Sequence, residues 1–200
     1  MNSLKLFLKK PKSILIIVLI IAFCLGFIFN IKSIAKNGNS GKVGIVSSNV
    51  LTNSLIPVNI KIPKVNINAN IEIVGLTSSG IVGSPDLPAN AAWFNKSPIP
   101  GDIGSSVIDG HTGWKDNIPA VFDNLNKIKI GDKVYVENGS GKVSVFIVRE
   151  LKTYSKDEIV PSVFVSTDNK AHLNLITCAG TWDEVNAGHS SRLVVFTDKE

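Results

Sequence analysis

Apolar and polar side chains alternate along much of the chain after residue 57. Residues 65–73, VNINANIEI, carry an apolar side chain at every second position, and residues 58–62 show a shorter version of the same pattern. A period of two is typical of a strand with one buried face. The pattern predicts further strands at 104–109, 132–138, 142–152, 172–177 and 192–197.

The connections between these strands carry turn residues. Asn-Gly-Ser-Gly at 138–141 predicts a hairpin turn, since Asn and Gly tolerate a positive φ. One short helix is predicted at 118–127, where Pro119 suits the first turn and Phe122 and Leu125 share a face. Many short strands with little helix predict an all-β domain, either a closed barrel or a sandwich.

A continuous apolar run precedes the β pattern. Residues 14–29 contain no polar side chain, and the whole span 13–31 has 19 residues, close to the about 20 needed to cross a bilayer as a helix. Four lysines precede the run and two follow it, which predicts a cytoplasmic N-terminus and an extracellular C-terminal part. A cleaved signal peptide is the alternative, but the following NIKSIAK is a poor cleavage site.

These features predict four segments. They are a cytoplasmic basic segment at 1–12, a single transmembrane anchor in the cell membrane at 13–31, a flexible linker rich in Gly, Ser and Asn at 32–56, and an extracellular domain at 57–200.

The net charge of +5 belongs to the predicted membrane flank. Residues 1–36 hold six lysines and no acidic residue, whereas the rest of the chain holds 15 basic and 16 acidic residues. No basic patch with interleaved aromatic residues follows, so nucleic acid is not an expected partner.

Two cysteines are too few for a disulfide framework. Cys24 lies in the predicted anchor and cannot reach Cys178, which follows the predicted strand 172–177. A lone cysteine after an apolar strand is often a small buried hydrophobic residue. In an oxidising compartment, however, a single unpaired thiol also fits a reactive nucleophile.

An arginine and a histidine lie where they can join Cys178. The chain has 19 lysines but only two arginines, Arg149 and Arg192, so a retained arginine can reflect a need for its planar, permanently charged group. If the last two strands form a hairpin across the loop 179–191, the end of the first, at Cys178, lies beside the start of the second, at Arg192. His111 also follows a predicted strand.

Such a set suits acyl transfer. A thiolate attacks a carbonyl carbon, His111 exchanges protons with the leaving and incoming groups, and Arg192 holds the substrate carbonyl or an oxyanion.

The remaining polar and aromatic candidates have simpler interpretations. Arg149 is expected on the surface, and His172 and His189 are expected to be structural or exposed. Asp109 can orient His111 or serve a turn. Trp93, Trp114 and Trp182 are expected to pack, although Trp182 lies near the candidate site. No cluster has zinc spacing, and no glycine loop suits phosphate.

Two segments together resemble the signature of sortases. NLITC at 174–178, followed by Arg192 in SRLVVFT, is similar to the sortase Thr-Leu-x-Thr-Cys…Arg motif, and GHT at 110–112 is similar to the sortase histidine segment. IKIPKVNINANIEIVG at 60–75 resembles the opening strands, and the sequence around CAGTWDEVNAGHSSRLVVF is most similar to class F sortases. The first Thr of the motif is Asn174 here, which predicts altered packing or specificity.

The resemblance implies a closed eight-stranded sortase-type β-barrel with one or two short helices. It implies a cysteine transpeptidase of the Gram-positive cell surface that needs no cofactor or metal. Its partners would be proteins with an LPxTG-like sorting signal and an amine acceptor, either a peptidoglycan precursor or a pilin lysine. Cys178, His111 and Arg192 would be catalytic, and Thr177, Thr112 and Trp182 would contact the substrate.

Two other functions remain open. An L,D-transpeptidase also uses Cys, His and Arg, but its motif places His-Gly before the cysteine, where this chain has Ile176 and Thr177. A non-catalytic, membrane-tethered β domain could instead bind a wall polymer or a surface protein through the tryptophans.

Overall fold

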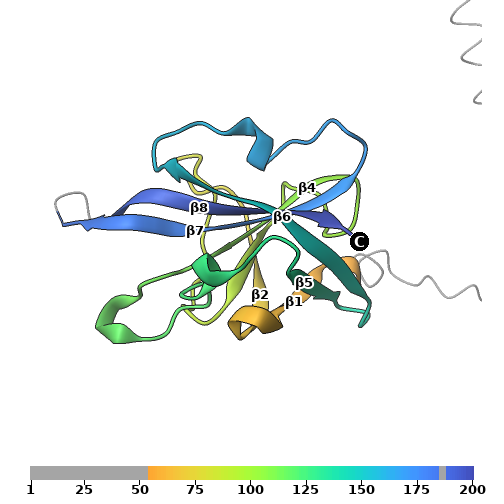
Figure 1. The fold of residues 1–200 in the computed structure, drawn as a ribbon, viewed down its shortest axis with the longest axis horizontal. Helices are drawn as coiled ribbons and strands as arrows, with labels where there is room; N and C mark the ends of the chain where they lie inside the picture. Colours follow the sequence, from red (N-terminus) through yellow and green to blue (C-terminus); the bar gives the residue numbers. More distant parts are fainter. Residues whose placement is uncertain (1–53, 185–187) are drawn as a thin grey trace, which may run out of the picture. The chain divides into compact units, whose positions relative to one another are not determined.

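Eight strands close into a barrel in the described part of the chain, residues 54–184 and 188–200 of a computed structural model. Around the barrel the strands follow the order β1-β2-β3-β4-β7-β8-β6-β5 (Figure 1). The strands are β1 (Pro57–Ile62), β2 (Ile67–Val74), β3 (Ala91–Phe94), β4 (Gly104–Gly110), β5 (Lys133–Asn138), β6 (Val143–Ser155), β7 (Ala171–Asp183) and β8 (Gly188–Lys199).

The closed barrel confirms the predicted fold class. Each predicted strand is present, although the run 65–73 begins as a strand only at Ile67, because Val65 closes a short 3-10 turn. The alternating pattern does not predict β3. All four of its residues are buried, so it has no polar face and no period of two.

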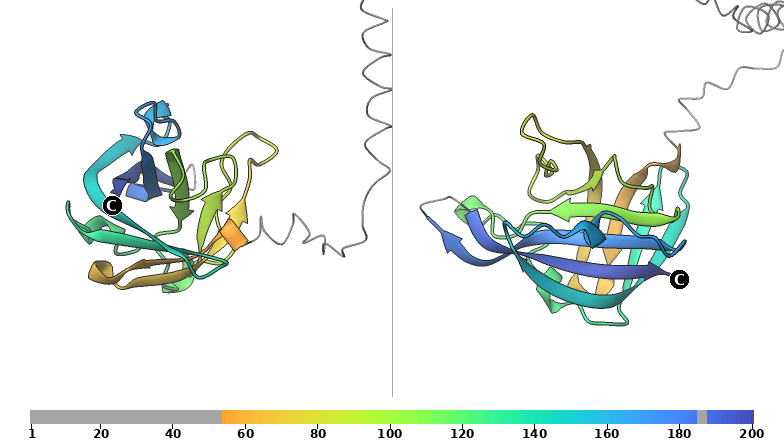
Figure 2. Two further views of the ribbon diagram at one scale, coloured as in Figure 1. Left: turned by 90° about the vertical axis from the view of Figure 1, so that its right-hand side faces the viewer. Right: turned by 90° about the horizontal axis from the view of Figure 1, so that it is seen from above.

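The barrel has an inner and an outer apolar cluster, because successive side chains of a strand point to opposite faces. On β7, Leu173 and Leu175 point into the barrel. Ile176 packs on the outer face with Val194 and Phe196 of β8. The β6–β7 connection covers this outer cluster with Val163, and it arches over the two strands in Figures 1 and 2.

The β7–β8 hairpin is longer than predicted. β7 does not end at Cys178 but continues to Asp183, and β8 begins at Gly188, not at Arg192. The paired ends therefore extend past the other strands (Figure 1). Pairing continues because the register shifts just after Ala179. Gly180 has a φ of 78° there. Glycine adopts such a positive φ without strain, so it suits a β-bulge.

The predicted helix at 118–127 is wrong. Ile118 is extended, and only a 3-10 turn at Leu125–Lys127 forms in this range. The backbone N–H groups of the segment have other partners: that of Phe122 donates to the His111 carbonyl, and that of Ala120 donates to the Asp123 carboxylate. These bonds fix a folded loop in place of the i→i−4 ladder of a helix.

The predicted anchor at 13–31 lies outside the described residues. Within residues 54–184 and 188–200, no helix has the length and apolar character to span a bilayer.

Candidate active site

Strand alternation brings Cys178 and Arg192 together on the outer face of the barrel. The two residues are direct partners in the antiparallel pairing of β7 and β8. Cys178 shares its face with Ile176, two residues earlier, and Arg192 shares its face with Val194. The predicted proximity of the thiol and the guanidinium is therefore confirmed, although Cys178 lies within a strand and not at its tip.

His111 reaches the same region from β4. This strand runs parallel to β7, with Asp109 opposite Ile176, and His111 follows its last residue. The His111 Nε2 lies 2.8 Å from the Pro85 carbonyl oxygen, and the ring packs on Trp114 with centroids 4.4 Å apart. Because a carbonyl only accepts, Nε2 carries a proton, and Nδ1 is the nitrogen left for proton exchange.

A carboxylate on β2 holds the loop that supplies the Pro85 carbonyl. The side chain of Glu72 accepts hydrogen bonds from the Asp86 N–H at 2.8 Å and from the Asn90 Nδ2 at 2.8 Å. Burial alone would raise the pKa of Glu72, but these bonds hold that pKa below its ordinary value. Glu72 therefore stays ionised and fixes the β2–β3 loop that orients His111.

The three predicted catalytic residues line one groove of about 560 Å³. Its floor is the outer face of β4, β7 and β8, and its walls are the β2–β3 and β6–β7 connections. The apolar lining comes from both walls and the floor, and it includes Ile81, Val82, Val160, Val163, Phe164, Ile176 and Val194. A groove with this apolar lining, in which Cys178, His111 and Arg192 also take part, suits an extended peptide with aliphatic side chains.

The Cys178 thiol is half-buried, and its surroundings oppose its ionisation. Burial raises the pKa of this thiol, the positive charge of Arg192 lowers it, and the negative charge of Asp109 raises it. The net shift is upward, so this thiol is neutral at neutral pH and the thiolate is a minor form.

Arg192 is held by the backbone of its own strand. Its Nη1 donates to the carbonyl oxygens of Ser191 at 2.9 Å and His189 at 3.2 Å. These two bonds fix the plane of the guanidinium. The remaining N–H donors can therefore meet a carbonyl or an oxyanion beside Cys178 without further ordering of the side chain.

The three residues predicted to contact substrate lie outside the groove lining. Thr177 points into the barrel, where its buried hydroxyl donates to the Gly110 carbonyl at 2.7 Å. Thr112 donates to the Asp123 carboxylate at 3.3 Å. Trp182 lies beyond the bulge, 56% exposed, edge-on to His189. Thr177 thereby ties β7 to the end of β4, next to His111, and substrate contact by the three remains a prediction.

Asn174, where the motif has Thr, anchors a wall of the groove. This buried side chain donates from Nδ2 to the Val163 carbonyl at 2.7 Å, across to the β6–β7 connection. The residue thus acts on the packing of the loop that covers the outer cluster.

The other histidine and arginine candidates lie elsewhere. His172 is buried near the start of β7, with Nδ1 2.7 Å from Asp198 and Nε2 3.0 Å from Asp168. Arg149 pairs with Asp198 at 2.9 Å, and nearly half of each of these two side chains is exposed. These contacts confirm the structural interpretation of His172 and the surface position of Arg149.

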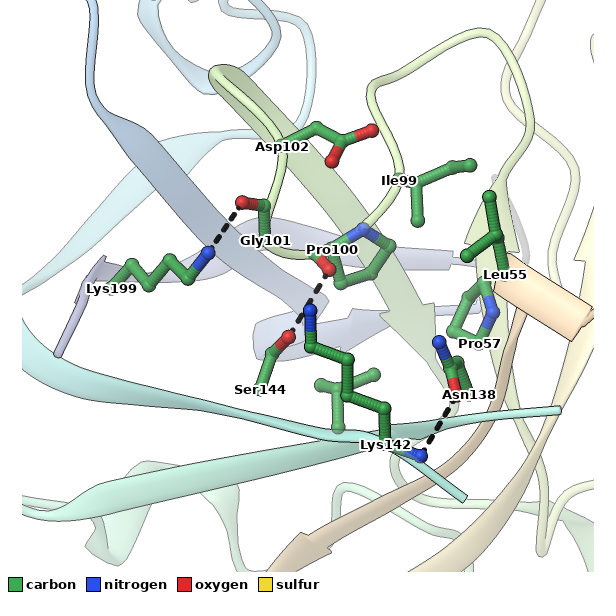
Figure 3. A pocket seen from close by; sticks show the side chains of 11 residues that line it. Leu55, Pro57, Ile99, Pro100, Gly101, Asp102, Asn138, Lys142, Ser144 and Lys199 are labelled. Carbon is green, nitrogen blue, oxygen red and sulfur yellow. Dashed lines mark hydrogen bonds between the residues drawn. The ribbon is translucent and has the colours of Figure 1, made fainter. Parts of the chain in front are cut away.

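A second, smaller pocket lies away from this groove. It has a volume of about 130 Å³ and is bounded by the start of β1, the β3–β4 connection and the end of β8. Figure 3 shows the Lys199 ammonium turned to the Gly101 carbonyl, at 2.7 Å, and the Ser144 hydroxyl turned to Pro100. These two polar groups thus bond to the backbone. Across the described residues, no cluster of three His, Cys, Asp or Glu side chains could hold a metal ion.

Sequence reasoning missed Glu72 and the loop that it holds. Glu72 is the one acidic side chain in the alternating run 65–73, where the other polar positions are asparagines. That difference is a signal, but the partners are 14 to 18 residues away, and no local pattern indicates them.

Comparison with known proteins gives one family. A family model described as the sortase domain matches residues 60–200. Among solved structures, the barrel is similar to a lid mutant of sortase A from Corynebacterium diphtheriae, with 24% identity, a TM-score of 0.57 and coverage of 73% of this chain and 70% of that one.

Two clostridial structures are similar to the same extent. Sortase C from Clostridium perfringens SM101 has 24% identity and a TM-score of 0.54, covering 72% of this chain and 70% of that one. A sortase D5 transpeptidase from Clostridium perfringens has 21% identity and a TM-score of 0.54, covering 72% and 78%. No curated protein matches the chain. At these identities the structures support the fold, and the family model supports the family.

Proposed function

Because the chain belongs to the sortase family, we propose that it is a cysteine transpeptidase that cleaves an LPxTG-like sorting signal and passes the released protein to an amine. The observation that carries the proposal is the groove in which Cys178, His111 and Arg192 meet. Its apolar lining suits the aliphatic part of such a signal, and Cys178, His111 and Arg192 suit the scissile carbonyl.

The first half-reaction forms a thioester. The Cys178 thiol gives its proton to His111 Nδ1, and its sulfur attacks the carbonyl carbon of the scissile bond. Arg192 stabilises the oxyanion, and the C–N bond then breaks. The leaving amine takes a proton from His111, whose Nδ1 is the available nitrogen, so charge and protons balance.

The second half-reaction releases the protein. An incoming amine gives a proton to His111 as its nitrogen attacks the thioester carbon. The C–S bond breaks, an amide forms, and the Cys178 thiolate is restored. The acceptor would be a peptidoglycan precursor or a pilin lysine.

We extend the proposal to the setting of the enzyme. Residues 13–31 would anchor the chain in the cell membrane of a Gram-positive organism, with residues 1–12 cytoplasmic and the barrel extracellular. The similarity of the segment from Cys178 to Phe196 to class F sortases supports that subtype.

The test is turnover of an internally quenched LPxTG-type peptide by the full chain in detergent, with and without a nucleophilic amine. We expect Cys178-dependent cleavage and, with amine present, a product joined to that amine. Cys178→Ala is the control and should abolish both products. If the peptide is not cleaved, alkylation of Cys178 followed by mass spectrometry decides. A reactive thiol would direct the search to another signal sequence, and an inert thiol would overturn the proposal in favour of a binding domain.

A further inference from the structure

A hydrogen bond and an aromatic contact hold the ring of His111 from two different loops. The bond from Nε2 to the Pro85 carbonyl, at 2.8 Å, fixes one point of the ring but not its plane. The Trp114 indole packs against the imidazole with centroids 4.4 Å apart and the planes tilted by 59°. His111 lines the groove, whereas Trp114 does not, so the indole contacts the ring from outside the groove.

The Asp123 carboxylate orders the turn that precedes Trp114. Its Oδ1 accepts hydrogen bonds from the Gly113 N–H at 2.8 Å and from the Thr112 hydroxyl at 3.3 Å. Its Oδ2 accepts a hydrogen bond from the Ala120 N–H at 2.8 Å. Gly113 has a φ of 64°, which glycine adopts without strain. Asp123 therefore ties the two residues before Trp114 to the far part of the β4–β5 connection.

The same part of the connection fixes the backbone at His111. The Phe122 N–H donates to the His111 carbonyl at 2.9 Å. A Cβ on Gly110 would lie 2.5 Å from the buried Phe122 ring, so only glycine allows this close approach. Since the backbone is held independently of Trp114, the orientation of the imidazole is what the indole contact controls.

We propose, on the basis of the function proposed above, that Trp114 is a positioning residue for His111 and that Asp123 acts through Trp114. The indole keeps the imidazole turned to the groove, so that Nδ1 faces the reacting nitrogen in both half-reactions. Asp123 contributes by ordering the turn that places the indole. The ring is then oriented from two loops: Glu72 holds the one that supplies the Pro85 carbonyl, and Asp123 holds the one that supplies Trp114.

The first experiment compares peptide turnover by the full chain in detergent with turnover by two variants at Trp114. Trp114→Ala should lower kcat by about 10–10²-fold and leave KM within about twofold, because the geometry of proton transfer is lost while the apolar lining is unchanged. Trp114→Phe keeps an aromatic face and should restore most of kcat. A raised KM at unchanged kcat would mean that Trp114 binds the substrate, which overturns the proposal.

Asp123→Asn tests whether Asp123 acts through the indole. The amide nitrogen of asparagine accepts no hydrogen bond, so one side of the Asp123 contacts is released, and kcat should fall by about three- to tenfold. In the double variant Trp114→Ala/Asp123→Asn, kcat should fall no further than in Trp114→Ala, whereas additive losses would overturn the coupling. Asp116→Asn is the matched control: it removes the same charge from an exposed position of the same loop, at a φ of 58° that asparagine accepts, and should leave kcat unchanged.

Proton NMR tests the placement of the ring without any peptide. The indole ring current shifts the Hε1 signal of His111, which is assigned by its absence in His111→Gln and read at about pH 9, where an ordinary imidazole is neutral. The signal should move in Trp114→Ala and in Asp123→Asn and stay in place in Asp116→Asn. If it moves but the wild type cleaves no peptide, the placement of His111 is supported and the proposed function fails.

A structural role for Trp114 predicts a different result. Trp114→Ala would then lower thermal stability and the amount of active enzyme but leave the Hε1 signal of the folded protein in place, which overturns the proposal. If Trp114→Ala does not fold, Asp123→Asn, at an exposed side chain, carries both the kinetic and the NMR measurement. An unchanged kcat and an unmoved signal in that variant would likewise overturn it.

Discussion

The outer face of the β7–β8 hairpin carries polar groups at both ends, and the two ends are built differently. One end of this face is the His172–Asp198 pair, and the other is the Cys178–Arg192 pair, beyond which the hairpin continues past the bulge to Asp183 and Gly188. Six residues of extended strand, or about 20 Å, separate the two pairs. The apolar middle of the face lies under the β6–β7 connection, which therefore reaches both ends.

The difference lies in which polar groups are satisfied. Both ring nitrogens of His172 contact carboxylate oxygens, and Asp198 also pairs with Arg149. At the other end, His111 uses one ring nitrogen on a backbone carbonyl, and among the described residues Arg192 donates only to carbonyls of its own strand. A closed network stabilises the fold, whereas groups with free capacity can act on a substrate.

Exchanging each of the two histidines for glutamine should distinguish the stabilising end from the reactive end most strongly. His111→Gln should lower kcat/KM by about 10²–10⁴-fold, because the proton donor for the leaving amine is lost, with little change in thermal stability. His172→Gln should cost about 1–3 kcal/mol of folding free energy, since a carboxylate loses its partner, and leave kcat/KM within about threefold when the protein is folded. The measurements are peptide turnover and thermal unfolding. Loss of turnover in both variants, at equal stability, would contradict the division.

Exchanging the two arginines for lysine should show the same division, with a smaller effect: Arg192 should affect activity and Arg149 should not. Arg192→Lys keeps the charge but loses the planar fork fixed by the Ser191 and His189 carbonyls, so kcat should fall by about 10–10²-fold. Arg149→Lys, in an exposed pair, should change stability by less than about 1 kcal/mol and leave kcat unchanged. Steady-state kinetics with the quenched peptide measure both. Equal kcat for Arg192→Lys and the wild type would mean that charge alone suffices.

Local sequence pattern predicts much of this comparison. Alternation indicates most of the strands, and the antiparallel pairing of the last two places Cys178 beside Arg192. The pattern fails at β3, whose four residues are all buried, and at 118–127, whose N–H groups bond to residues such as His111 and Asp123. Both faces of β3 are buried by neighbours that are remote in sequence. The His111 carbonyl, which accepts the hydrogen bond from the Phe122 N–H, likewise lies outside the segment 118–127.

The electrostatics of the site are harder to predict than its members. The sequence indicates Asp109 only as a residue that can orient His111 or serve a turn. Its place on the groove floor depends on the parallel pairing of β4 with β7, which no turn or spacing indicates. The role of Glu72 depends on the fold of the whole β2–β3 loop.

The last contrast concerns how the stability of the His172 end depends on pH. Hydrogen bonds from Ser166, then His172 and the Lys170 N–H, hold the pKa of Asp168 well below its ordinary value. A depressed pKa in the folded state means that Asp168 adds stability above the unfolded value of about 4, and that this contribution is lost as pH falls toward the folded value. Asp168→Asn should therefore unfold a few degrees below the wild type at neutral pH, and the two melting temperatures should converge as the pH falls below about 4.

The matched control lies at the groove end of the same connection. Asp157 is exposed and forms an ion pair with its neighbour Lys156, at 3.2 Å, so Asp157→Asn should melt with the wild type at every pH. Thermal unfolding by circular dichroism, from neutral pH down to about 2.5, measures all three proteins. A constant difference between Asp168→Asn and the wild type over that range would mean that packing of residues 166–170, and not the ionised Asp168, holds the His172 end closed.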